Sequence, residues 1–141
     1  MTAHPRQELD RRLTTLRSGC GASCVFVLDT SGQNYGASSP LPLDWEQLAE
    51  PVGPLLLAAL EEHPPRRGGH LHLLRGVEPP YFAAESFAGV YLVLVIFRAP
   101  FDGATVGALV REALPEVEAL TLTQPPPDPT RDARVVALRS A

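Results

Sequence analysis

The most apolar segment of the sequence lies at residues 90–97, which read Val-Tyr-Leu-Val-Leu-Val-Ile-Phe. Eight consecutive apolar residues, most of them β-branched or aromatic, leave neither face of a strand suited to water. The pattern therefore predicts a central strand that is buried on both faces. As a helix, the same segment would extend only about 12 Å, which is too short to cross a bilayer. A strand buried on both faces requires helices on each side, and we expect the remaining sequence to provide them.

Four other segments have the pattern of strands, at residues 23–29, 33–38, 70–75 and 81–87. The first is apolar on both faces, so we expect it beside residues 90–97, whereas the second is polar enough for an edge of the sheet. The third begins with alternating polar and apolar residues, which is typical of a half-exposed strand. The fourth enters the central strand through the short turn Ala88-Gly89, which predicts a hairpin and therefore antiparallel pairing.

Two amphipathic helices are predicted near the ends of the chain. The first, over residues 5–17, has an apolar stripe formed by Leu9, Leu13 and Leu16 and is followed by the stop signals Gly19 and Gly21. The second, over residues 103–114 with Asp102 as its cap, has a stripe formed by Val106, Leu109, Val110 and Ala113. The pattern of residues 116–123 fits either a short strand or an extended segment.

A third helix is predicted from Asp44, an N-cap whose capping box includes Gln47 and whose hydrophobic staple joins Leu43 and Leu48. The main apolar stripe of this helix, which we expect to face the sheet, contains Trp45, Leu48, Val52, Leu55, Leu56, Ala59 and Leu60. A second, small and uncharged surface is formed by Gly53, Pro54, Leu57 and Ala58. A helix that is apolar on two sides has two packing partners. Pro51 and Pro54 are expected to kink or split the helix near Gly53.

The elements follow one another as helix, two strands, helix, three strands and helix. This order predicts an α+β domain of three layers, α/β/α, with a five-stranded, mainly antiparallel sheet in the middle. We expect the domain to comprise residues 1–123. Residues 124–141 start with a proline-rich linker and are expected to form a flexible C-terminal tail.

The charge of the chain excludes several classes of partner. Its net charge of -4 argues against nucleic acid or an anionic membrane, because both require a concentrated basic surface. All twelve basic residues are arginine, so mechanisms that need a lysine, such as a Walker A phosphate site or a Schiff base, are excluded. The N-terminal segment lacks the apolar core of a secretory signal, and we therefore expect a cytoplasmic protein.

Four side chains, those of Cys20, Cys24, His70 and His72, are of the types that a Cys2His2 zinc site uses. Their spacing has no zinc signature, so a buried cysteine and a surface histidine are the favoured interpretation. A thiol enzyme would need a base and an oxyanion hole around Cys20, and no known local motif surrounds that residue. The sequence also has no glycine-rich phosphate loop. We therefore expect no cofactor, no metal and no catalytic residue.

The order of elements resembles that of the roadblock family. The similarity includes the strand and acidic turn Val25-Phe26-Val27-Leu28-Asp29-Thr30-Ser31-Gly32, the long apolar middle helix, and the strand pair that ends at residues 90–97. The family includes dynein light chains and the bacterial MglB type, which is the partner and GTPase activator of a Ras-like gliding-motility GTPase. The resemblance covers residues 9–122. It implies a profilin-like fold in which the middle helix covers one face of the sheet and the terminal helices cover the other.

The resemblance also implies a function. In the family, a homodimer forms through the middle helix and the third strand, and a small GTPase docks on the paired helices. On this sequence the dimer or partner interface would consist of Gly53, Pro54, Leu57, Ala58, Glu61, His70, His72 and Leu74. The expected protein is a non-enzymatic, homodimeric signalling or adaptor module that binds a Ras-like small GTPase and regulates its nucleotide cycle. Two alternatives stay open: a structural scaffold subunit of a motility or polarity complex with no GTPase contact, and a small thiol or zinc enzyme.

Overall fold

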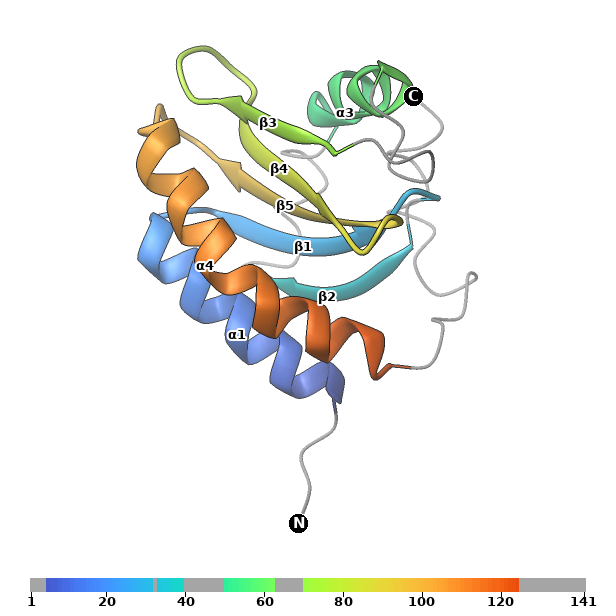
Figure 1. The fold of residues 1–141 in the computed structure, drawn as a ribbon. Helices are drawn as coiled ribbons and strands as arrows, with labels where there is room; N and C mark the ends of the chain where they lie inside the picture. Colours follow the sequence, from blue (N-terminus) through green and yellow to red (C-terminus); the bar gives the residue numbers. More distant parts are fainter. Residues whose placement is uncertain (1–4, 32, 40–49, 63–69, 125–141) are drawn as a thin grey trace.

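The five predicted strands form one antiparallel sheet (Figure 1). They are β1 (Cys24–Asp29), β2 (Asn34–Ser38), β3 (His72–Arg75), β4 (Tyr81–Phe87) and β5 (Tyr91–Phe97). Their spatial order is β2-β1-β5-β4-β3, so β2 and β3 are the two edges. The computed structural model describes residues 5–31, 33–39, 50–62 and 70–124.

β5 is the middle strand of the sheet, as its unbroken apolar run predicts. It pairs with β1 on one side, where Val93 lies opposite Val27, and with β4 on the other, where Val93 lies opposite Glu85. Its residues 92–97 are all buried. The side chains of Val93, Val95 and Phe97 face one helical layer, and those of Leu92, Leu94 and Ile96 face the other. Each fully buried aliphatic or aromatic side chain of this kind contributes about 1.5–3 kcal/mol.

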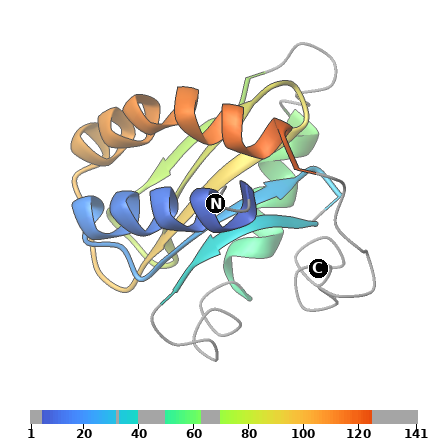
Figure 2. The ribbon, with the colours of Figure 1, turned by 90° about the horizontal axis from the view of Figure 1, so that it is seen from below.

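Helices cover both faces of the sheet. α1 (Pro5–Cys20) and α4 (Gly103–Leu122) lie side by side on one face, and α3 (Val52–Glu62) lies on the other (Figures 1 and 2). The buried leucines of α1 and valines of α4 share one apolar cluster with β5, whereas the buried residues of α3 belong to a second cluster. The predicted three-layer α+β architecture is confirmed.

α1 ends at the glycine signal that the sequence contains. Its last turn closes with two backbone hydrogen bonds, from Ala22 N to Arg17 O at 3.0 Å and from Gly21 N to Ser18 O at 3.4 Å. This pattern is a Schellman motif, which needs a left-handed residue directly after the helix. Gly21 has a φ of +71° and adopts that conformation without the steric cost that a Cβ would impose. Gly19, in contrast, lies within the helix.

α4 is longer than predicted, because it continues through Pro115 to Leu122. The expectation of a strand or extended segment over residues 116–123 is wrong. A proline inside a helix costs about 3 kcal/mol, since it removes a hydrogen bond and crowds the preceding turn. Val117 and Thr121, however, are buried and continue the inward face of the helix, and Thr121 Oγ1 satisfies itself by donating to Val117 O at 2.7 Å. Burial of this added turn on the sheet and α1 offsets the cost.

α3 begins at Val52, directly after Pro51, and the predicted middle helix before residue 50 lies outside the described residues. Pro54 lies in the first turn of α3, where a missing N–H removes no intrahelical bond, so it does not break the helix. The predicted N-cap at Asp44, its capping box and the stripe residues Trp45 and Leu48 lie outside the described residues.

The last described residue is Gln124, whose Nε2 donates to the backbone oxygen of Tyr35 on β2 at 3.0 Å. α4 ends at Leu122, and the domain limit at residue 123 stays a prediction. The predicted tail from residue 125 onwards lies outside the described residues. In the ranges that the structure describes, no helix is long and apolar enough to cross a membrane.

The turn between β4 and β5 contains two consecutive residues with positive φ, Ala88 at 53° and Gly89 at 78°. This conformation costs an alanine about 1–2 kcal/mol and costs a glycine almost nothing. We predict that Ala88→Gly raises the free energy of unfolding by about 0.5–1 kcal/mol. Gly89→Ala, whose added Cβ meets no neighbouring atom, should lower it by about 1 kcal/mol. Urea unfolding followed by circular dichroism measures both, and equal stability of all three proteins would contradict the strain.

Candidate protein interaction site

The outer face of α3 is apolar and exposed. Pro54, Leu55 and Ala58 are exposed there, and Leu57 is half-buried beside them. The helix has no charged side chain over residues 52–60. A surface helix normally presents polar side chains to water, so a helix of this composition is suited to contact with another protein.

The inner face of α3 differs from the predicted stripe. Val52 and Leu56 are buried against the sheet, and the partly buried residues of the same helix that pack with them are Ala59 and Leu60. Leu55, predicted to face inward, is 36% exposed, whereas Gly53, predicted on the outer face, is buried. The predicted stripe treats residues 45–60 as one helix, whereas α3 begins at Val52, so the residues before Pro51 do not set the rotation of its turns. The prediction that Gly53 lies on the outer face of α3 is therefore wrong, and the residue is buried.

The remaining predicted residues of α3 have the exposure that an interface requires. Pro54, Ala58 and Glu61 are exposed, and Leu57 is half-buried. Their role in an interface stays a prediction.

Among the residues that the structure describes, β3 is an edge of the sheet, with a hydrogen-bonded neighbour on one side only, and we call this its open edge. Its residues alternate between exposed and half-buried, as the sequence predicts. An unpaired edge presents a row of backbone donors and acceptors to which another strand can bind. Leu71 and Leu73 belong to the same apolar cluster as Val52 and Leu56 of α3. The apolar helix and the open strand edge are therefore neighbours.

The predicted side chains on and before β3 do not share a face with α3. His72 lies opposite Glu85 of β4, and Leu74 packs over Gly103 and Gly107 of α4. His70 is exposed, and its Nε2 lies 3.6 Å from Glu85 Oε2. The structure thus brings the backbone of β3 close to α3, but it directs His72 and Leu74 toward the opposite helical layer.

Glu85 is a buried carboxylate that joins three elements. Its side chain is only 6% exposed, and its Oε1 accepts a hydrogen bond from His72 Nδ1. Arg111 of α4 donates from Nη2 to His72 Nε2 at 3.0 Å, and its Nε lies 3.7 Å from Glu85 Oε1. Because an arginine only donates, His72 Nε2 must accept, which places the ring proton on Nδ1 facing Glu85. The series Arg111, His72, Glu85 attaches the edge strand to α4 and gives the buried Glu85 side chain polar partners.

Sequence reasoning missed Glu85 and Arg111. The available signal was a single acid within the otherwise apolar segment Tyr81–Phe87, since a charge at a buried strand position requires a partner. The partners themselves lie on β3 and α4. Only the strand register and the packing of α4 on the sheet bring them to Glu85.

Of the four side chains considered for zinc, His70 and His72 both approach Glu85, whereas Cys24 lies apart from them. Cys24 lies on β1 and His72 on β3, and the strands β5 and β4 stand between them. Cys24 is fully buried in the cluster beneath α3, whereas His72 faces α4. Among the residues with a described position, no group of three or more His, Cys, Asp or Glu side chains could hold a metal ion. The geometry gives no support to a zinc site.

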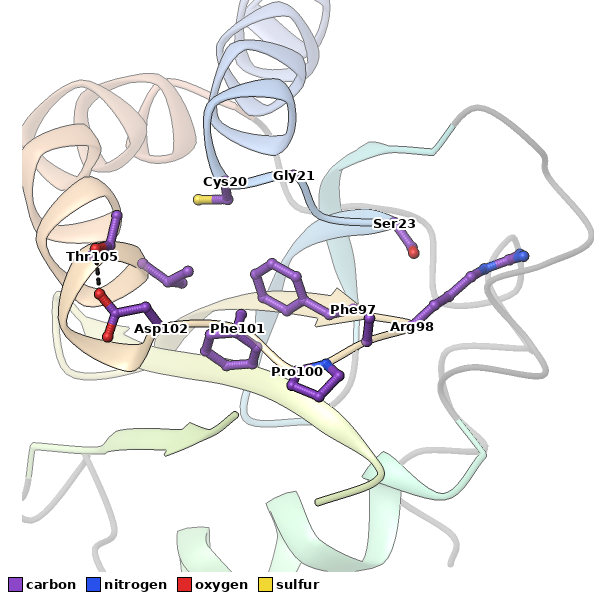
Figure 3. Close-up of a pocket in the computed structure, with 11 residues that line it drawn as sticks. Cys20, Gly21, Ser23, Phe97, Arg98, Pro100, Phe101, Asp102 and Thr105 are labelled. Atoms are coloured by element: carbon purple, nitrogen blue, oxygen red, sulfur yellow. Dashed lines mark hydrogen bonds between the residues drawn. The ribbon is translucent and has the colours of Figure 1, made fainter. Parts of the chain in front are cut away.

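Cys20 lines a pocket of about 330 Å³ between the end of α1, the end of β5 and the start of α4 (Figure 3). Phe97 and Phe101 stack with ring centroids 4.1 Å apart, and Thr105 Oγ1 donates to Asp102. Burial raises the pKa of the Cys20 thiol above its ordinary value. The described residues that line the pocket include no histidine that could act as a base. The raised pKa lowers the fraction of reactive thiolate at Cys20, so the pocket gives no support to thiol catalysis.

The arrangement of elements matches solved structures with the roadblock fold. MglB from Myxococcus xanthus superimposes with a TM-score of 0.60 at 14% identity, over 91% of this chain and 98% of that chain. The gliding protein MglB from Thermus thermophilus gives 0.66 at 14% identity, over 88% and 96%. The roadblock/LC7 domain from Streptomyces avermitillis gives 0.55 at 20% identity, over 77% and 97%.

Compared by sequence, the chain matches no family model and no curated protein. Structural similarity at 14% to 20% identity shows a common fold. The resemblance noted in the sequence is confirmed at that level.

We predict that Cys20 reacts with iodoacetamide more slowly in the folded protein than in the unfolded chain at the same pH. The raised pKa lowers the fraction of thiolate in the folded state, and the rate should increase with pH until the thiol is ionised. Cys24, which is fully buried, should react more slowly still. Mass spectrometry of alkylated peptides gives both rates, and Cys20→Ser is the control. Faster alkylation of Cys20 in the folded protein would restore the thiol-enzyme alternative.

Proposed function

We propose that this protein, which has the roadblock fold, is a non-enzymatic, homodimeric adaptor that binds a Ras-like small GTPase and regulates its nucleotide cycle. The observation that carries the proposal is the apolar outer face of α3 beside the open edge of β3. The proposed setting is the cytoplasm, and the proposed partners are a second copy of the chain and the GTPase.

The positions of β3 and α3 support a dimer in which the β3 edges of two copies pair about a twofold axis. Antiparallel edge strands can join two sheets into one without changing either fold, and the contact is closed by symmetry. α3 covers the face of the sheet near β3, where Leu71 and Leu73 contact its cluster. The same axis would bring two α3 helices close together. Removal of their apolar outer surfaces from water would contribute about 25 cal/mol per Å².

The end of α3 gives a reason for a second protein on this surface. Glu61 and Glu62 lie in its last turn, which has no basic residue. Negative charge at this end is unfavourable to the helix dipole by about 0.3–1 kcal/mol per residue, and basic side chains of a partner would offset it. The similarity to the roadblock family supports a Ras-like GTPase as that partner, since such GTPases dock on the paired helices of family members.

A structural scaffold subunit of a motility or polarity complex is the second candidate. The apolar face of α3 would serve any protein partner, and one structure that shares the fold is named as a gliding protein. Such a scaffold would hold its partners together without contacting a GTPase. Binding that depends on bound nucleotide separates the two functions.

We predict that Ala58→Glu weakens self-association at least about tenfold, because it places a charge on the apolar face of α3. Ala58 is exposed, so the substitution does not disturb the core. The matched control is Ala119→Glu, the same change at an exposed position of α4 on the opposite layer. Sedimentation velocity at several protein concentrations measures the dissociation constant. A monomeric wild-type protein, or equal effects of the two substitutions, would contradict the interface.

We also predict that the purified protein captures a small GTPase from extract of the source cells, to different extents with GDP and with a non-hydrolysable GTP analogue. Ala58→Glu should reduce the capture and Ala119→Glu should not. The purified GTPase should then hydrolyse or exchange nucleotide at a different rate when the protein is added. An unchanged rate with intact binding would indicate a scaffold. Failure to capture any GTPase, with GDP or with the GTP analogue, would contradict the proposal.

A further inference from the structure

The two edge strands of the sheet differ in how far the rest of the molecule covers them. β3 is alternately exposed and half-buried, whereas every residue of β2 is buried except the half-buried Ala37. An edge strand normally leaves backbone donors and acceptors free for another chain. On β2, a side chain of α1 and one that follows the end of α4 occupy such groups.

A polar stripe of α1 binds β2. Asp10, Thr14 and Arg17 recur at helical spacing beside the apolar stripe of the same helix. Asp10 Oδ1 accepts a hydrogen bond from the backbone N–H of Ala37 at 2.9 Å. Thr14 Oγ1 lies 2.8 Å from Ser38 Oγ, to which Arg17 Nε also donates at 3.0 Å. Because Ala37 N–H is used by a side chain of α1, it is not available to a further strand.

A second contact closes the other end of β2. Gln124, which follows the C-cap of α4, donates from Nε2 to the backbone oxygen of Tyr35 at 3.0 Å. The pairing of β1 with β2 also shifts register between Val27 and Leu28, which leaves Tyr35 as the extra residue of a bulge. Bulges twist an edge away from regular pairing. One backbone acceptor of β2, Tyr35 O, and one backbone donor, Ala37 N–H, are thus already hydrogen-bonded. The bulge at Tyr35 also makes the strand irregular.

We propose that β2 is a latent strand-pairing surface for a second copy of this chain, and that Asp10 and Gln124 keep it closed. A second copy is the fitting partner, because its own β3 is an open antiparallel edge of similar length. Pairing of β2 in one copy with β3 in the next uses two different surfaces and does not close on itself, so it would extend into an open assembly. Closure of β2 leaves β3 as the edge available for pairing, and this holds whether or not a GTPase binds.

The test removes the two side chains that bond to the backbone of β2 and leaves the buried core residues unchanged. We predict that Asp10→Ala combined with Gln124→Ala raises the weight-average mass roughly twofold or more as protein concentration increases, beyond that of the wild type. The control combines Glu8→Ala and Thr123→Ala. Glu8 is similar to Asp10 in exposure, 35% against 39%, and neither control side chain bonds to β2. Light scattering and sedimentation velocity measure the mass, and circular dichroism confirms that each variant is folded.

A third substitution identifies the edge that pairs. Ala37→Pro removes the outward N–H of β2, and a proline is tolerated at an edge position of this kind. Added to the double variant, it should return the mass to the wild-type value. Amide exchange of Ala37 reports opening directly and should be about tenfold or more faster in Asp10→Ala. This second measurement keeps the test decisive if the double variant is unstable.

Unchanged mass of the double variant, with accelerated exchange at Ala37, would overturn the proposal. Unchanged exchange at Ala37 would also overturn it, since Asp10 would then not close the edge. Increased mass that survives Ala37→Pro would assign the assembly to another surface and would equally contradict it. The outcome is separate from that of Ala58→Glu, because it concerns growth beyond the wild-type mass. In the homodimer proposed above β3 is already paired, so there the opened β2 must compete with that pairing for β3.

Discussion

Burial of β5 on both faces is the constraint on which the rest of the structure depends. Residues 92–97 are removed from water only when helices cover each side of the sheet, and the alternation of side chains assigns α1 and α4 to one layer and α3 to the other. Each helix needs one apolar face for this purpose. α1 presents polar residues such as Arg11 and Thr15 on its outer side, whereas α3 presents Pro54, Leu55 and Ala58. Burial of the central strand thus places α3 in the layer opposite the terminal helices, and α3 is the helix whose outer apolar surface stays exposed.

Polar contacts then distinguish the two edges of the sheet. At β3, Glu85 holds the strand to α4 through His72 and Arg111, and these contacts use side chains on one face while the backbone edge stays open. At β2, Asp10 and Gln124 bond to the backbone itself. A sheet with one open and one closed edge pairs in a limited number of ways. This asymmetry is what makes a closed dimer, rather than an extended array, the assembly that we infer.

Most of the fold was predictable, and the errors have physical causes. Strand limits followed from local apolar patterns, because each pattern reflects burial of one short segment. The extension of α4 was missed since a local rule gives Pro115 a cost, while the compensating burial of Val117 and Thr121 depends on α1, far away in the sequence. The inward position of Gly53 was missed because the apolar stripe was counted through Pro51 as one continuous helix. Exposure of Pro54, Ala58 and Glu61 was predicted correctly, because the first two lie off the main apolar stripe of the helix and the third is charged.

By itself, the sequence determined the order of the elements, the central place of β5 and the two-sided character of the middle helix. Each of these depends on periodicity within a single segment, which is a local property of the chain. Only the tertiary structure decided that Glu85 meets His72 and Arg111, that Leu74 turns toward α4, and that Asp10 and Gln124 close β2. These contacts join residues from separate elements, and they depend on strand register and helix rotation. Neither quantity is encoded in the local pattern, because both are set by how the layers pack around β5.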